Sequence, residues 1–69
     1  MQLSARNQLR GKVKSIKTGT IMAEVLVELP DGQQIVSAIT RGSVEALNLA
    51  DGDDIVVVIK STEVMLGKN

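Results

Sequence analysis

Cysteine and histidine are both absent from this 69-residue sequence. Without cysteine the chain can form no disulfide, and without either residue it has no thiolate or imidazole cage for a transition metal. Nucleophilic sites that activate a serine or a cysteine with a histidine are excluded for the same reason. The sequence therefore lacks the side chains of the commonest metal centres and hydrolytic sites.

Aromatic residues are also missing, since there is no Trp, Tyr or Phe. Proteins that bind single-stranded nucleic acid without sequence preference stack the bases on aromatic rings. Hydrophobic residues still make up 43% of the chain, and all of them are Val, Ile, Leu, Ala or Met. This composition is typical of tightly packed strands. We expect a β-rich core and no nucleic-acid partner.

A chain of 69 residues supports one domain, which we place at residues 1–69. A domain of this size buries a modest fraction of its surface and is marginally stable alone. Small scaffolds add disulfides, structural metals or partner subunits. Because Cys and His are absent, we expect partner subunits, in a homo-oligomer.

The amino-terminal residues 1–6 contain no apolar segment of the kind found in secretory signal peptides. No stretch approaches the roughly 18 apolar residues of a membrane span. We therefore expect a soluble, cytoplasmic protein without a membrane partner.

The charges balance overall, with eight basic and eight acidic residues, but they are unevenly distributed. Five of the eight basic residues lie in the first 17 positions, which contain no acid. These residues are Arg6, Arg10, Lys12, Lys14 and Lys17. The pattern has two interpretations: the charges decorate solvated strand faces, or the amino-terminal segment faces an anion.

Alternating hydrophobicity predicts two strands in the first half of the chain. Residues 9–16 mix apolar and basic side chains and favour a strand that breaks at residues 17–19. Residues 20–29 alternate with period two, which is typical of a strand with one buried face. The predicted buried row is Ile21, Ala23, Val25, Val27 and Leu29. Leu26 on the opposite face indicates partial cover there, as at a subunit contact.

The second half begins with a Pro-Asp-Gly-Gln turn at residues 30–33, which predicts a hairpin with a returning strand at 34–40. Helical spacing from Val44 to Leu49 predicts a short helix, with Ser43 as its N-cap and Glu45 in its first turn. A turn at residues 51–53 ends this helix.

Residues 55–59 form a continuous β-branched run, which predicts a strand buried on both faces. The Ser/Thr-then-Glu pattern at 60–63 predicts a short helical turn. Residues 64–66 are expected to pack as a lid or a subunit contact. With a fifth short strand from one terminus, this order predicts an all-β fold, a small OB-like five-stranded β-barrel with one short helix.

An enzyme is not expected, and no catalytic residue is assigned. A carboxylate pair is conceivable among Asp51, Asp53 and Asp54, but acids in a glycine-containing turn serve turn geometry and solubility. The six glycines are scattered, so no phosphate-binding loop is present.

Three segments combine hydroxyls, cations and irregular backbone, namely residues 4–7, 40–43 and 60–61. Each alone has a structural explanation, as terminal residues, a helix cap or a solvated strand end. Together they offer an arginine fork, a lysine, hydroxyl donors and a helix start, and none contains a carboxylate. Glu45 and Glu63 flank two of the segments and must point away. The combination favours binding of a small dianion.

The same segments carry a family resemblance. Ser4-Ala5-Arg6-Asn7-Gln8-Leu9-Arg10-Gly11, Ile39-Thr40 with Ser43-Val44, and Ile59-Lys60-Ser61 with Glu63-Val64-Met65-Leu66-Gly67 together resemble the molbindin (Mop) family of TOBE, OB-like domains. Leu47, Leu49 and the stretch 13–23 also match. The resemblance covers nearly the whole chain, and the combined motifs are more specific than any one of them.

The resemblance implies a cytoplasmic protein that binds molybdate, and often tungstate, in a homohexamer built as a trimer of dimers. Because no regulator or transporter is fused to this chain, it implies storage or homeostasis of the oxyanion. It implies no organic cofactor and no direct protein–metal ligand. It also implies a second type of site on a threefold axis, to which no residue is assigned.

Carried over by motif, the anion-binding residues are Ser4, Arg6, Lys60 and Ser61, with backbone N–H groups near Ala5 and Asn7. Thr40 and Ser43 match hydroxyls that complete the pocket from the helix start. Arg41 occupies a variable position and stays outside the predicted site.

Two other functions remain open. An OB-fold nucleic-acid-binding module is favoured by the basic first strand, and disfavoured by the missing aromatics and the zero net charge. A purely structural oligomerisation or sensor domain is favoured by the small size and by the apolar residues 64–66.

Overall fold

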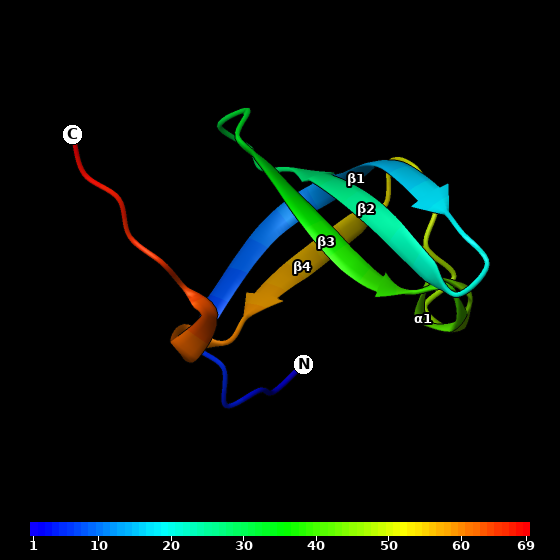
Figure 1. Cartoon of the computed structure of the whole chain (residues 1–69), viewed down its shortest axis with the longest axis horizontal. Coiled ribbons are helices and arrows are strands. Elements are labelled where there is room, and N and C mark those ends of the chain that lie inside the picture. The colour runs from blue at the N-terminus through cyan, green and yellow to red at the C-terminus, as the bar shows by residue number, and fades with distance from the viewer.

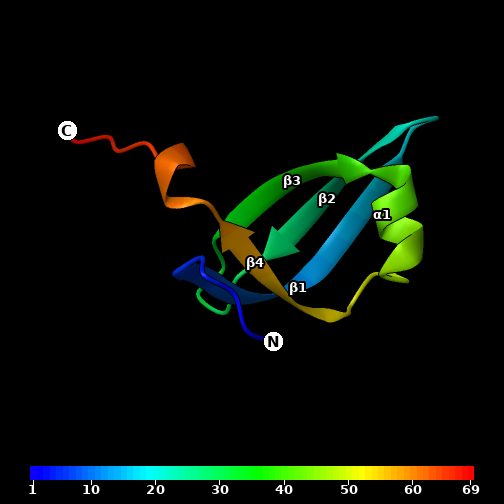
Figure 2. The same cartoon turned by 90° about the horizontal axis from the view of Figure 1, so that it is seen from below.

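The computed structural model describes residues 1–69 as a curled antiparallel sheet with one short helix (Figures 1 and 2). The strands are β1 (Asn7–Thr18), β2 (Met22–Glu28), β3 (Gln34–Thr40) and β4 (Asp54–Ile59). The helix α1 (Arg41–Ala46) joins β3 to β4, and the 3₁₀ turn η1 (Ser61–Glu63) follows β4. The strand order is β3-β2-β1-β4. The predominance of strands and the helix before the last strand confirm the sequence prediction.

The boundaries of β3 agree with the prediction, whereas those of β1 differ from it. β3 covers the predicted residues 34–40. β1 continues through Thr18, so the break predicted at residues 17–19 was placed too early. The reason is that Lys17 and Thr18 still pair with Glu24 and Ala23 of β2. The turn begins at Gly19, whose backbone N–H donates to the Met22 carbonyl oxygen at 2.7 Å.

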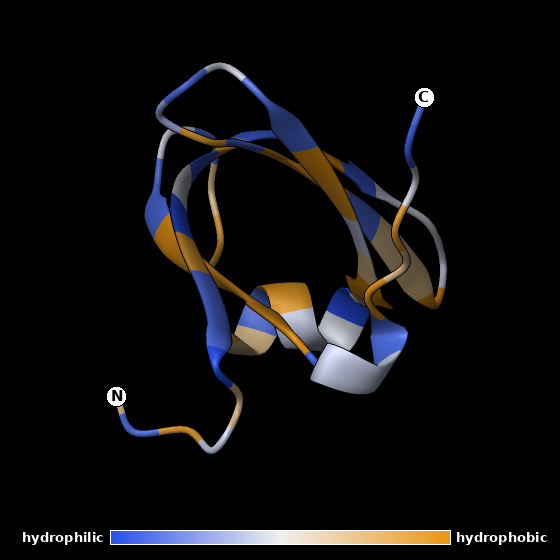
Figure 3. Ribbon diagram, turned by 90° about the vertical axis from the view of Figure 1, so that its left-hand side faces the viewer, coloured by the Kyte–Doolittle hydropathy of each residue, from blue (hydrophilic) through white to orange (hydrophobic).

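The core lies on the concave side of the sheet and is small. Its five buried residues are Val13, Ala23, Val25, Val27 and Val44. The middle of the predicted row on β2 is therefore confirmed, and Leu26 on the other face is half-buried, as expected. Ile21 is 73% exposed, contrary to the prediction, because it lies in the turn before β2. Figure 3 shows the strands curving around the interior, with α1 beneath them.

Gly11 allows β1 and β2 to approach each other closely. A Cβ atom at this position would lie 2.8 Å from the Glu28 carbonyl oxygen and 2.8 Å from a methyl carbon of Val27. Both distances are shorter than any ordinary contact. The sheet packs at this point because β1 carries no side chain there.

The helix begins earlier than predicted. Its N-cap is Thr40 rather than Ser43, since the Thr40 hydroxyl oxygen accepts a hydrogen bond from the Ser43 backbone N–H at 3.0 Å. Glu45 consequently lies beyond the first turn, which contains no acid. Its carboxylate instead pairs with Arg41, with 3.1 Å between Nε and Oε1. The extended backbone of Thr40 fixes this start, because an N-cap residue itself has non-helical dihedral angles.

β4 and the carboxyl terminus also differ from the prediction. β4 was expected to be buried on both faces, but it pairs only with β1 at the edge of the sheet, and Val58 is 44% exposed. Neither terminus forms a fifth strand within the chain, so the sheet has four. The turn expected at 60–63 is confirmed as η1. Met65 and Leu66 form no lid within the chain, since they are 92% and 95% exposed, and Val64 is 46% exposed.

None of the helices is both long enough and apolar enough to cross a lipid bilayer.

Candidate anion-binding site

The segment before β1 and the segment after β4 meet in a shallow hollow of about 450 Å³. We call this hollow the Arg6–Lys60 cup. Its lining residues are Ser4, Ala5, Arg6, Val58, Lys60 and Ser61. Five of these six were predicted from the sequence as anion-binding residues. The structure thus brings two of the three predicted segments together, although more than 50 positions separate them in the chain.

The pairing of β1 with β4 explains why these segments converge. The two strands are antiparallel, and Asn7, the first residue of β1, pairs with Ile59, the last residue of β4. The residues just before Asn7 and just after Ile59 therefore leave the sheet at the same end. Asn7 itself is half-buried and lies next to the cup without lining it.

Local hydrogen bonds shape both walls of the cup. The Gln8 side-chain amide donates to the Ala5 carbonyl oxygen at 2.6 Å, which turns the amino-terminal segment back toward the sheet. On the other wall, Ser61 begins η1, and the Glu63 backbone N–H donates to the Lys60 carbonyl oxygen at 2.9 Å. Ser61 thus leaves the strand direction directly after Lys60.

The cup carries uncompensated positive charge. The three ion pairs of the chain are Lys12–Asp54, Lys14–Glu28 and Arg41–Glu45. Arg6 and Lys60 belong to none of them, and no carboxylate lines the cup. Arginine and lysine beside serine hydroxyls provide charge-assisted and neutral donors for a tetrahedral oxyanion. The arrangement suits a dianion chemically, but its side chains are exposed in the single chain.

Thr40 and Ser43 lie outside the cup. Their hydroxyl oxygens are 2.7 Å apart at the start of α1. β3 and β4 occupy opposite edges of the sheet, so the end of β3 and the end of β4 are separated. Figures 1 and 2 both show α1 at one end of the molecule and η1 at the other. A site that contains all three predicted segments therefore needs a second copy of the chain.

Val58 is the one lining residue that the sequence analysis did not identify. It lies two positions before Lys60, whose backbone continues the extended direction of β4, so both side chains point to the same side. This period-two relation was the signal that could have found it. Its methyl groups give the cup an apolar wall.

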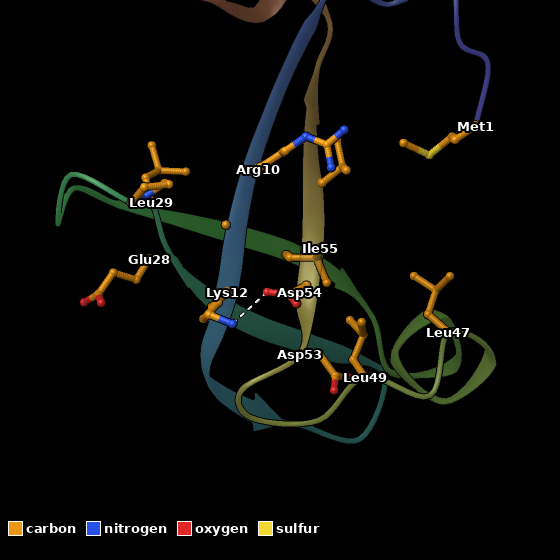
Figure 4. A pocket seen from close by; sticks show the side chains of 13 residues that line it. Met1, Arg10, Lys12, Glu28, Leu29, Leu47, Leu49, Asp53, Asp54 and Ile55 are labelled. Atoms are coloured by element: carbon orange, nitrogen blue, oxygen red, sulfur yellow. Dashed lines mark hydrogen bonds and ion pairs between the residues drawn. The ribbon is translucent and has the colours of Figure 1, made fainter.

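A larger hollow of about 860 Å³ is lined by 13 residues, among them the first three residues of β4 (Figure 4). Glu28, Asp53 and Asp54 supply carboxylates to it, and Lys12 Nζ lies 2.7 Å from Asp54 Oδ1. Arg10 also lines this hollow and belongs to no ion pair, but three carboxylates repel a dianion and Lys12 is already paired, so the larger hollow is the poorer anion site. The larger volume therefore favours one hollow and the charge of the lining residues favours the other. For an anion the charge decides, so the cup is the candidate site.

The Lys12–Asp54 pair predicts a measurable pH effect. The hydrogen bond from Lys12, and then its charge, lower the pKa of Asp54. Because the folded pKa lies below the unfolded one, the pair stabilises the fold above the unfolded pKa. The contribution is lost as the pH falls through the folded pKa.

We expect Lys12→Met to return the pKa of Asp54 to its ordinary range, as measured by NMR titration of the carboxyl carbon. The effect on stability should be slight, since both side chains are solvent-exposed. Lys14→Met, which removes the partner of Glu28, is the matched control and should leave Asp54 unchanged. An Asp54 pKa that stays low in Lys12→Met contradicts the assignment.

Comparison with known proteins places this geometry in context. Residues 3–66 match the model of the TOBE domain. Molybdenum-pterin-binding protein 1 of Clostridium pasteurianum is 50% identical over 66 residues, which cover 96% of this chain and 97% of that protein. The structure of a molybdate-binding protein from Sporomusa ovata superposes with a TM-score of 0.93 at 40% identity, covering 99% of this chain and 100% of that one. MopII from Clostridium pasteurianum gives 0.92 at 45% identity, covering 97% and 100%.

Proposed function

Because the chain belongs to the molbindin (Mop) group of the TOBE-domain family, we propose that it binds molybdate reversibly. The observation that carries this proposal is the Arg6–Lys60 cup, in which two unpaired cations and two serine hydroxyls converge without a carboxylate. The molybdate binding named for the Sporomusa ovata protein, which has the same fold and a similar length, supports the same ligand.

We assign the contacts as follows. Arg6 and Lys60 hold the charge of the anion, and the hydroxyls of Ser4 and Ser61 donate to its oxygens. Backbone N–H groups near Ala5 and Asn7 complete this half of the site. Thr40 and Ser43 provide the second half from another copy, because their own chain holds them away from the cup.

Binding requires no covalent chemistry. Molybdate is a dianion at neutral pH, so donors that already carry protons are sufficient, and no general acid is needed. Tungstate has the same charge and shape, and we propose that it binds as well. Sulfate shares the charge and shape but is smaller, so selectivity against sulfate arises from the spacing of the donors. The proposed role is storage or homeostasis of the oxyanion in the cytoplasm.

Assembly is part of this proposal. The chain buries only five residues and exposes eleven large apolar side chains. Small domains with so little core usually gain stability from partner subunits. We propose a homohexamer, arranged as a trimer of dimers, with the oxyanion at the subunit interfaces.

Calorimetric titration with molybdate, tungstate and sulfate, together with a solution mass from light scattering, tests the function. We expect saturable binding of molybdate and tungstate by an oligomer, and much weaker binding of sulfate. An absence of molybdate binding combined with salt-sensitive oligonucleotide binding would instead support a nucleic-acid module. A stable oligomer that binds neither ligand would support a purely structural domain.

A further inference from the structure

The carboxyl-terminal segment is apolar at residues 64–66 and is paired with no strand of its own chain. Val64 has β backbone angles, with φ −90° and ψ 121°, and the residues after it belong to no helix or strand. Met65 and Leu66 are 92% and 95% exposed. In Figures 1 and 2 this segment leads away from the body of the molecule. Burial of such apolar side chains against another surface is favourable, and their backbone N–H and C=O groups are free to pair with another strand.

β3 offers an open edge that lacks the usual protection. It pairs only with β2, and its sequence Gln34–Thr40 contains no charge and no proline. Its pairing with β2 runs through all seven residues without a bulge. Natural edge strands are normally guarded by at least one of these devices. The other open edge, β4, begins with the charged Asp54.

The outer face of β3 adds an apolar surface next to this open edge. Val36 is 60% exposed and pairs with the half-buried Leu26 of β2, so an apolar pair lies beside the open edge. A strand that is added to β3 with an apolar residue opposite Val36 extends this pair by one more side chain.

We propose that residues 64–66 of one copy add to β3 of a second copy as an antiparallel strand. Met65 then lies opposite Val36, while Val64 and Leu66 lie opposite Ser37 and Ile35. The added segment supplies the fifth strand that the sequence predicted and that neither terminus forms within its own chain.

This direction of pairing joins the two halves of the site, and this part of the inference rests on the proposed function. An antiparallel segment enters β3 at its Thr40 end. Ser61 precedes Val64 by one 3₁₀ turn, which rises about 2 Å per residue. Ser61 therefore lies roughly 6 Å before Val64, or about two strand positions. That distance places Ser61 beside Ile39, next to Thr40 and Ser43 of the second copy.

A disulfide tests the register directly, because the protein has no cysteine of its own. The double variant Met65→Cys/Val36→Cys, oxidised in the absence of molybdate, should form covalent dimers and larger species linked between positions 36 and 65. A disulfide needs Cα atoms within about 7 Å of each other. Met65→Cys/Val58→Cys is the control, since Val58 is also exposed and lies on the other edge strand. Linkage to position 58 with none to position 36 overturns the proposal.

A second pair of variants tests the connection with the site. Leu66→Asp should dissociate the oligomer and weaken molybdate binding at least tenfold, whereas Asn69→Asp makes the same charge change beyond the added strand and should do neither. Disulfide formation between positions 36 and 65 without molybdate binding by the parent would refute the proposed function alone. Molybdate binding without that disulfide would refute the strand addition alone.

Discussion

Arg6→Ala and Lys60→Ala are each expected to weaken molybdate binding by roughly 10- to 150-fold while the oligomer survives. Loss of a charge-assisted donor in a closed site costs about 1.5–3 kcal/mol, and 1.4 kcal/mol corresponds to a factor of ten. Neither side chain takes part in an ion pair or lies in the core, so removal of either one should leave the fold intact. Calorimetric titration gives the affinity, and light scattering gives the mass.

Lys17→Ala provides the matched control for these two variants. It also removes one positive charge, but Lys17 lies on β1 near the Thr18 end of the strand, far from the cup. Lys17→Ala should change the affinity for molybdate only through long-range electrostatic attraction, which salt screens. If Arg6→Ala and Lys60→Ala both bound molybdate like the parent, the cup would not be the site.

Gly11→Ala is expected to destabilise the fold by about 1–3 kcal/mol, as overpacked positions do. The added Cβ meets a backbone oxygen at 2.8 Å, and a strand backbone moves less readily than a flexible side-chain end. In a domain of this size, each kcal/mol lowers the Tm by roughly 4–8 °C. Thermal unfolding at a fixed protein concentration measures the change, since assembly makes the Tm depend on concentration.

Gly67→Ala separates this clash from the general effect of replacing glycine. A Cβ at position 67 meets nothing within 4 Å. Its Tm should stay close to that of the parent, since exposed substitutions usually change stability by about 0.5 kcal/mol or less. If the Gly11→Ala variant matched the Gly67→Ala variant, β1 and β2 would not be held as closely as the structure indicates.

Much of the sheet was predictable because period-two alternation depends only on neighbouring residues. Ala23, Val25 and Val27 were placed on the inner face by that pattern, and they are buried. Ile21 shares the pattern but lies in a turn, which alternation alone does not detect. The burial of β4 was overestimated for a related reason. A run of Ile and Val looks the same whether the strand lies in the centre of a sheet or at its edge, as β4 does.

The residues of the candidate site could be proposed from the sequence, but their arrangement in space could not. Residue chemistry and the family resemblance pointed to Ser4, Arg6, Lys60 and Ser61, and the β1–β4 pairing brings them together. No local pattern reveals that Asn7 pairs with Ile59, because this contact joins distant parts of the chain. The sequence also does not reveal that Thr40 has a structural role in the helix. Its hydroxyl caps α1 and contacts Ser43, so one side chain serves the helix and remains a proposed ligand.

The position of the cup at the last pair of the β1–β4 ladder has a dynamic consequence. Strand ends fray at a lower free-energy cost than strand centres, through local openings that leave the rest of the fold intact. An anion held between Arg6 and Lys60 fastens the two chain segments that separate first in such an opening. In the proposed complex, opening of this strand end separates Arg6 from Lys60, so the anion can leave while the core around Val25 and Val27 stays folded.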